Sequence, residues 1–209
     1  MHLSLDTNVV IAATVGEPDR LRGAWNLFDS REARERFITQ GVVDEFLGTV
    51  EGVGRDAPGI VTELISDCLN AIRIWGDEPP TEAKLTGAGL THPRQDRVMR
   101  FVRASFEVAG EPWSAHMAKR AIRDFERQYA VRKQVFFQSH PVYDPADSSS
   151  VTSFRLSLEP LIPNGGASWK NDCLILGQVA AVLQERRLTG EFVTEDHRHL
   201  GRHSPEITR

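Results

Sequence analysis

The sequence has few of the features that stabilise small secreted domains or anchor membrane proteins. It has 2 cysteines in 209 residues, too few for a disulfide framework. Cys68 and Cys173 lie in apolar stretches typical of helices, so we expect reduced thiols in the core. No apolar run reaches the about 18 residues that a membrane span needs. The N-terminus has no basic region before its apolar residues, and Asp6 interrupts these early, so we expect no signal peptide and a cytoplasmic protein.

An excess of positive charge is also missing. The chain carries 25 Lys and Arg against 29 Asp and Glu, a formal net charge of −4. Proteins that hold nucleic acid through bulk charge usually have a basic footprint, so this total argues against that class. The charge is uneven, however, because residues 94–133 hold ten basic and five acidic side chains, a net of +5.

The composition is that of an ordinary globular protein, with 40% hydrophobic and 26% charged residues. The sequence has no internal repeat. Apolar runs predict three buried strands. The first ends near residue 6, and the other two cover 37–40 and 191–194. Helical periodicity predicts helices over 21–36, 42–50, 60–75, 94–108, 112–138 and 171–187. Segments rich in Gly, Pro, Asp or Ser predict loops over 51–58, 141–150 and 163–166. This order of elements predicts an α/β fold with a central helical insertion.

Four acidic residues fall near the ends of these predicted elements. They are Asp6 after the first strand, Glu45 one turn into the helix after the second, Asp172 at the start of the last helix, and Asp196 after the last strand. If the strands are parallel, these acids share the sheet edge at which ligands bind in α/β proteins. Clustered carboxylates repel one another, and Mg²⁺ or Mn²⁺ relieves that repulsion. The pattern predicts a site with one or two such ions that activates water at a phosphodiester.

Each acid also has a purely structural interpretation. Asp6 is well placed to cap the following helix, and Asp172 to interact with a helix dipole. Glu45 suits a solvated helix position. Asp6 is the hardest to explain in this way, because an acid next to so apolar a strand costs free energy unless it is paired or binds a metal.

Four short motifs resemble those of PIN-domain nucleases. They are Asp6-Thr7-Asn8 after a strand, the segment 37–47 with Glu45, the helix start Asn171-Asp172, and Thr194-Glu195-Asp196 after the last strand. The resemblance implies a Rossmann-like parallel sheet flanked by helices and a Mg²⁺- or Mn²⁺-dependent nuclease, most often a ribonuclease. It covers under half of the chain, roughly 1–50 and 168–200.

The interval between Glu45 and Asp172 is much longer than in compact toxin-type PIN domains. The chain is therefore similar to longer PIN-like proteins, and we expect one domain over 1–209 with a largely helical insertion over 52–165. By position, the resemblance implies that Asp6, Glu45 and Asp172 are catalytic and hold the main metal ion, while Asp196 completes or supports a second. The residues that it implies as hydrogen-bond partners of these acids are Thr7, Asn8 and Thr194. Ordinary turn chemistry explains these three residues equally well.

The predicted helix over 112–138 has a basic face. On a helical wheel, one arc of about 100° holds Lys119, Arg120, Arg123 and Arg127. This face suits a nucleic-acid backbone, although a solvated surface explains a basic stripe as well. Shortly before Asp172, Lys170 is a candidate for a phosphate contact and Trp169 is a candidate for stacking on a base. The structural alternatives are an ordinary loop lysine and a tryptophan packed in the core. The histidines 197, 199 and 203 indicate a polar tail more than a zinc site.

Three functions from different classes remain open. The leading hypothesis is hydrolysis of RNA, with single-stranded DNA as a second substrate. The resemblance also suggests a toxin–antitoxin role with an inhibitory protein partner, while a homo-oligomer stays open. A silent PIN-like scaffold that acts through its helical insertion is the alternative. A phosphatase with Asp6 as nucleophile is disfavoured, because Asn8 stands where that chemistry wants a second acid.

Overall fold

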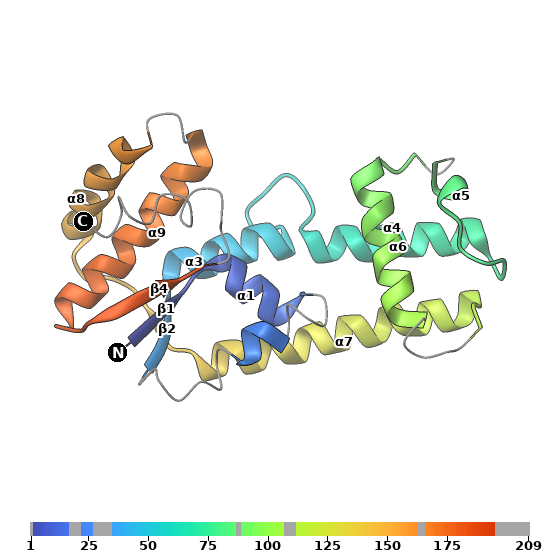
Figure 1. Ribbon diagram of the computed structural model, residues 1–209, viewed down its shortest axis with the longest axis horizontal. Coiled ribbons are helices and arrows are strands. Elements are labelled where there is room, and N and C mark those ends of the chain that lie inside the picture. The colour runs from blue at the N-terminus through green and yellow to red at the C-terminus, as the bar shows by residue number, and fades with distance from the viewer. Residues whose placement is uncertain are drawn as a thin grey trace. The chain divides into compact units, whose positions relative to one another are not determined.

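The computed structural model describes residues 2–16, 22–26, 35–86, 89–106, 112–162 and 166–194 (Figure 1). The chain forms two compact units. Met1–Leu47 and Arg132–Arg209 form the first, and Gly48–Val131 forms the second. We call them the sheet unit and the helical unit, and we describe each by itself.

The sheet unit contains a four-stranded parallel sheet with the order β3-β2-β1-β4. Figure 1 labels three of these strands, β2, β1 and β4. The strands are β1 (His2–Leu5), β2 (Glu35–Thr39), β3 (Val142–Tyr143) and β4 (Gly190–Val193). In the centre, Ser4 of β1 pairs with Phe37 of β2 and with Phe192 of β4. Because all pairs are parallel, the carboxyl ends of the strands lie at one edge, which confirms the α/β prediction.

Helices flank this sheet. They are α1 (Thr7–Thr14), α3 (Gln40–Phe46), α8 (Ser148–Leu158), α9 (Gly166–Glu185) and the last turns of α7 (Ala115–Ser139). A π-helical turn, η1 (Leu47–Glu51), follows α3, and a 3₁₀ turn, η2 (Glu159–Leu161), follows α8. Val179 and Val182 of α9 pack on Phe37 of the sheet. Close packing of α8 on α9 needs Gly177, because a Cβ there would lie 2.9 Å from the carbonyl oxygen of Val151.

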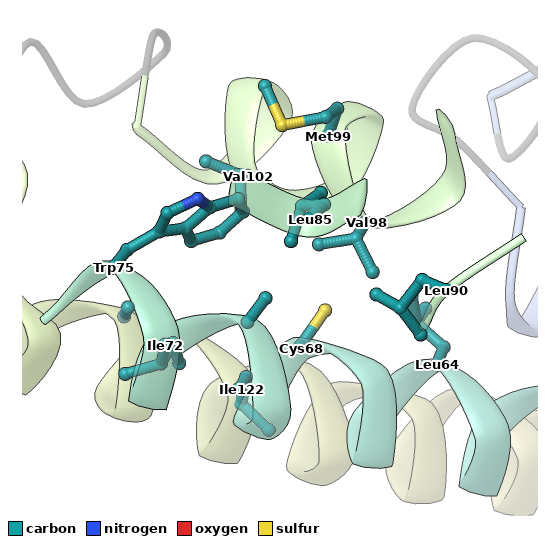
Figure 2. Packing of buried hydrophobic residues seen from close by; sticks show 12 residues of the cluster. Leu64, Cys68, Ile72, Trp75, Leu85, Leu90, Val98, Met99, Val102 and Ile122 are labelled. Atoms are coloured by element: carbon teal, nitrogen blue, oxygen red, sulfur yellow. The ribbon is translucent and has the colours of Figure 1, made fainter. Parts of the chain in front are cut away.

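The helical unit consists of α4 (Ile60–Trp75), α5 (Glu82–Thr86), α6 (His92–Phe106) and the first part of α7. Its core is almost entirely apolar. Figure 2 shows Cys68 and Trp75 of α4 facing Leu85, Val98 and Val102, and Ile72 of α4 belongs to the same cluster. The heptad-like spacing of these α4 residues explains why the sequence predicts this helix with its observed bounds.

Several boundaries differ from those predicted. β2 begins at Glu35 rather than at Phe37, and Gln40 belongs to α3. Gly41 lies in the first turn of α3, where Gln178 of α9 accepts a hydrogen bond from its backbone N–H. Of the predicted helix over 21–36, residues 22–26 are helical and 35–36 are in a strand, while 27–34 lie outside the described residues.

The segment predicted as a loop over 141–150 contains β3 and the start of α8. A two-residue strand is too short to show periodicity, which is why the sequence pattern missed it. α8 begins after Asp147, whose carboxylate accepts a hydrogen bond from the N–H of Ser149. α9 begins at Gly166, several residues before the predicted start. Residues 132–162 group with the sheet unit, so the separate helical unit is shorter than the segment 52–165.

Both cysteines are free and buried, as predicted. Burial raises the pKa of each thiol to about 12, so neither is a thiolate at neutral pH. Within the described ranges, no helix combines the length and apolar character required to cross a bilayer.

Candidate carboxylate site

Asp6 follows β1 and begins the site. Its side chain is 6% exposed, and its extended backbone makes it the N-cap of α1. Oδ1 accepts a hydrogen bond from the N–H of Thr7 at 2.8 Å. Oδ2 accepts one from the hydroxyl of Thr194 at 2.6 Å and a longer one from the amide of Asn8 at 3.4 Å. Asp6 therefore caps a helix, but capping occupies only one of its oxygens.

Glu45 lies on α3 and is held from both sides. Its Oε2 accepts a hydrogen bond from the hydroxyl of Thr7 at 2.5 Å, and its Oε1 accepts one from the amide of Asn171 at 2.6 Å. Glu45 is half-buried, so the purely structural interpretation of Glu45 as a solvated helix residue does not hold. Thr7 links the two acids, because its N–H binds Asp6 and its hydroxyl binds Glu45.

A contact between α3 and α9 positions the helices that carry Glu45 and Asn171. The N-cap of α3, Thr39, makes no capping hydrogen bond with its side chain. Instead, Gln178 Oε1 of α9 accepts the N–H of Gly41 at 2.9 Å. A Cβ at position 41 would lie 2.5 Å from that oxygen, so only glycine allows this contact as it stands.

The electrostatics of the site disfavour its negative charge. Burial raises the pKa of Asp6, and the nearby charge of Glu45 raises it further. The hydrogen bonds from Thr194, Thr7 and Asn8 act in the opposite direction but do not cancel the effect of burial. A bound cation would stabilise both carboxylates in the ionised form.

The donor set fits a hard divalent cation. An ionised carboxylate has about four lone-pair sites. Asp6 uses three of them and Glu45 uses two for the hydrogen bonds described above, so both keep capacity for a ligand. Mg²⁺ is commonly held by one or two carboxylates together with water and substrate phosphate. Asp6 and Glu45 are the residues that would hold it here.

The structure describes Asp172 but not Asp196. Asp172 is half-buried on α9, directly after Asn171, and its charge adds to the effects that raise the pKa of Cys173. Asp196 lies outside the described residues. Within the part of the chain that the structure describes, no group of three or more His, Cys, Asp or Glu side chains is arranged to hold a metal ion. The roles of Asp172 and Asp196 as ligands therefore stay predictions.

Sequence reasoning missed Asn171 and Thr39. Asn171 belongs to one of the predicted motifs, but that motif assigns the role to the acid beside it. Thr39 lies two residues beyond Phe37, as Asp6 lies two beyond Ser4, so the two occupy matching positions on neighbouring strands. Among the residues that the structure describes, the buried Thr39 hydroxyl has no hydrogen-bond partner, which adds an oxygen at this edge of the sheet. The sequence signal that could have identified Thr39 is its position near the end of a predicted buried strand.

The basic face of α7 is present in the helical unit. All four of its predicted residues are exposed, namely Lys119, Arg120, Arg123 and Arg127. Asp124 Oδ2 lies 3.8 Å from Arg120 Nε, and Asp124 Oδ1 lies 3.9 Å from Arg127 Nη1. Both distances are long for ion pairs. Lys119 and Arg123 have no ion pair with any described residue. The opposite side of the helix packs into the core through Ala118 and Ile122.

Trp169 is buried and so is not exposed for stacking on a base. It is 2% exposed and packs with Cys173, and its Nε1–H donates to the carbonyl oxygen of Glu159 at 3.1 Å. Lys170 is exposed, but it lies on α9 rather than in a loop. The histidines 197, 199 and 203 lie outside the described residues.

Comparison of the chain with models of protein families, with curated proteins and with solved structures finds no match in any of the three.

Proposed function

We propose that this chain is a Mg²⁺- or Mn²⁺-dependent nuclease of the PIN type whose substrate is RNA. The observation that carries the proposal is the pair of Asp6 and Glu45 at the carboxyl edge of a parallel sheet. Each of their four oxygens accepts at least one hydrogen bond from a neighbouring residue. Such support fixes carboxylates in position before a ligand binds, which is what a metal-dependent hydrolase requires.

The chain's own residues orient and hold the carboxylates. Thr7 sets the position of Glu45 relative to Asp6, because it donates to both. Thr194 and Asn8 orient Asp6, and Asn171 orients Glu45. We propose Asp172 and Asp196 as further ligands, on the resemblance alone. A bound divalent ion supplies neutralisation of phosphate charge and a lowered pKa for a water ligand.

The basic face of α7 is proposed to contact the phosphate backbone of RNA. Lys119, Arg123 and Arg127 succeed one another at intervals of four residues, or about 6 Å along the helix axis. The double variant Lys119→Gln with Arg123→Gln should weaken binding of a single-stranded RNA. Its slope of log affinity against log salt should be less steep by about 1.4, since each phosphate contact contributes about 0.7. An unchanged slope would remove this face from the binding surface.

Hydrolysis of labelled RNA and of single-stranded DNA in Mn²⁺ tests the proposed activity. Asp6→Asn and Glu45→Gln should each lower the rate about 100-fold or more, because each removes a charged metal ligand. Asp44→Asn is the matched control, since Asp44 is exposed beside Glu45 and bonds to Gln40 instead. Its rate should stay within about twofold of the native rate. Equal rates for native and Asp6→Asn chains would reject the nuclease.

The same assay separates Asp172 from Asn171. Asp172→Asn should abolish hydrolysis if Asp172 is a ligand, whereas Asn171→Ala should only reduce it about tenfold, because it removes one hydrogen bond to Glu45. Full activity of Asp172→Asn would remove Asp172 from the site while leaving Asp6 and Glu45 in place. RNA binding without hydrolysis in every chain would favour the scaffold alternative. The toxin–antitoxin role, an inhibitory partner and a homo-oligomer stay predictions of the resemblance.

A further inference from the structure

The helical unit contains a cavity that the proposed nuclease site does not use. Its volume is about 460 Å³, within the range of small-molecule sites. It lies between α4 and the segment that leads into α6. Its polar lining includes Ser66, Asn70, Arg73 and Arg94.

Arg94 is held rigidly at this cavity. Its Nε donates to Asp67 Oδ2 at 2.8 Å, and its Nη2 donates to the other oxygen of the same carboxylate. Asp67 is 2% exposed and is the single acid among the lining residues. The paired contact raises the pKa of Arg94, which keeps it cationic, and leaves its Nη1 without a hydrogen-bond partner among the described residues.

Arg73 brings a second guanidinium to the cavity. Its one described contact is the bond from Nη2 to the Asn70 side-chain oxygen at 2.9 Å, and it has no carboxylate partner within the described residues. Ser66, Asn70 and Arg73 follow at spacings of four and three, so they share one face of α4. Their free donors are a hydroxyl, an amide and a guanidinium. The lining therefore has more uncommitted hydrogen-bond donors than acceptors among the described contacts. Its charge is net positive, because it contains two arginines and one acid.

We propose that this cavity binds a small molecule with a phosphate monoester group. The Arg73 guanidinium and the Arg94 Nη1 are donors that suit phosphate oxygens, and the two arginines with Asp67 leave a net charge of one positive unit in the lining. Leu90 lines the cavity and also packs beside Leu64 in the helical core, so this part of the lining is apolar and continuous with the core (Figure 2). A polar lining over an apolar floor suits a phosphorylated polar compound rather than an apolar ligand.

Calorimetric titration of the full chain with inorganic phosphate and with 5′-AMP, in EDTA, tests this proposal. EDTA removes divalent ions, so the carboxylate site adds no anion binding, and the result is independent of nuclease activity. Both probes should bind saturably at one site. Arg73→Gln should weaken binding about tenfold or more, because it removes charged hydrogen bonds, and Ser66→Ala should weaken it about twofold to fivefold.

Arg100→Gln is the matched control, because it removes one exposed positive charge from α6 outside the cavity lining. It should change the affinity by less than about twofold. Arg94→Lys keeps a positive charge beside Asp67 but loses the fork, and it should weaken binding about tenfold while the circular dichroism spectrum stays native. No saturable binding to the native chain, or equal affinity of the Arg73→Gln and native chains, would overturn the proposal.

Discussion

The two units bury polar groups in very different ways. The sheet unit contains six of the seven buried polar or charged residues described, namely Ser4, Asp6, Thr7, Thr14, Thr39 and His140. In the helical unit the seventh, Asp67, is paired with Arg94. Of the six, Asp6, Thr7 and Thr39 lie at the carboxyl edge of the sheet, where burial disfavours the charge of Asp6. Among the described residues, the helical unit buries one polar side chain and is stabilised by apolar packing.

The largest effect is expected in the helical core. Trp75 is 2% exposed, lies edge-on to Trp113 with ring centroids 5.4 Å apart, and donates its Nε1–H to the carbonyl oxygen of Thr81. Trp75→Ala should lower the free energy of unfolding by about 3–5 kcal/mol, measured by urea denaturation. Leu69→Ala, at an exposed position of the same helix, should cost less than about 1 kcal/mol. Similar losses from both variants would contradict an apolar core as the source of stability.

In the sheet unit, the contact of Gly41 with Gln178 should give a strongly non-additive pair. Gly41→Ala should cost about 1 kcal/mol, because the end of the Gln178 side chain must move away from the new methyl group and loses its hydrogen bond. Gln178→Ala should cost about 1 kcal/mol for the lost hydrogen bond. The double variant should be more stable than Gly41→Ala alone, because the shortened side chain on α9 leaves room and alanine favours a helix. Additive losses in a double-mutant cycle would show that the contact does not constrain α3.

Removal of the buried charge at Asp6 should stabilise the metal-free chain. The pKa of Asp6 is raised in the folded state, so the stability that its protonated form contributes is present below about 3.8 and is lost as pH rises through the folded pKa. Asp6→Asn should therefore raise Tm at pH 7 by about 2–4 °C, and the gain should vanish below pH 3.8. Asp44→Asn should leave Tm unchanged. A lower Tm of Asp6→Asn at pH 7 would contradict a charge penalty at the site.

The smallest effect is expected at the exposed cap of α8. Hydrogen bonds from Ser149 and Ser150 lower the pKa of Asp147 to about 2. Their contribution to stability is thus present above about pH 3.8 and is lost as pH falls through 2. Asp147→Ala should lower Tm by a few degrees at most at pH 7, and by less at pH 2. Thermal scans at the two pH values measure the difference, and Ser148→Ala serves as the control at the first helical position. An equal loss at both pH values would contradict a role for the ionised cap.

Long periodic elements were predictable from the sequence, and features created by tertiary contacts were not. α4 matches its predicted range because its apolar residues repeat with the helical period. β3 has two residues, and its place beside β2 depends on pairing with a distant segment. The predicted end of the second strand is off by one residue, because Gln40 begins α3. The hydrogen bond between Gly41 and Gln178 joins residues on two helices, which a local rule cannot connect.

The candidate site was predictable in part for the same reason. Asp6 and Glu45 could be placed together because parallel strands present their carboxyl ends at one edge. The hydrogen bond from Asn171 to Glu45 joins residues far apart in sequence, and periodicity contains no information about the rotamer that makes it. Trp169 was a candidate for base stacking, but its burial in a cluster with Cys173 follows from packing that a sequence pattern does not contain.

The most direct test of the proposed cation site is Mn²⁺ binding to the native, Asp6→Asn and Glu45→Gln chains, followed by Tm. At Mn²⁺ concentrations about 100 times Kd, binding should stabilise the native chain by about 2.7 kcal/mol. Both variants should show little or no shift, although Asp6→Asn begins with the higher Tm. If Mn²⁺ raised the Tm of Asp6→Asn as much as that of the native chain, Asp6 and Glu45 would not form the cation site.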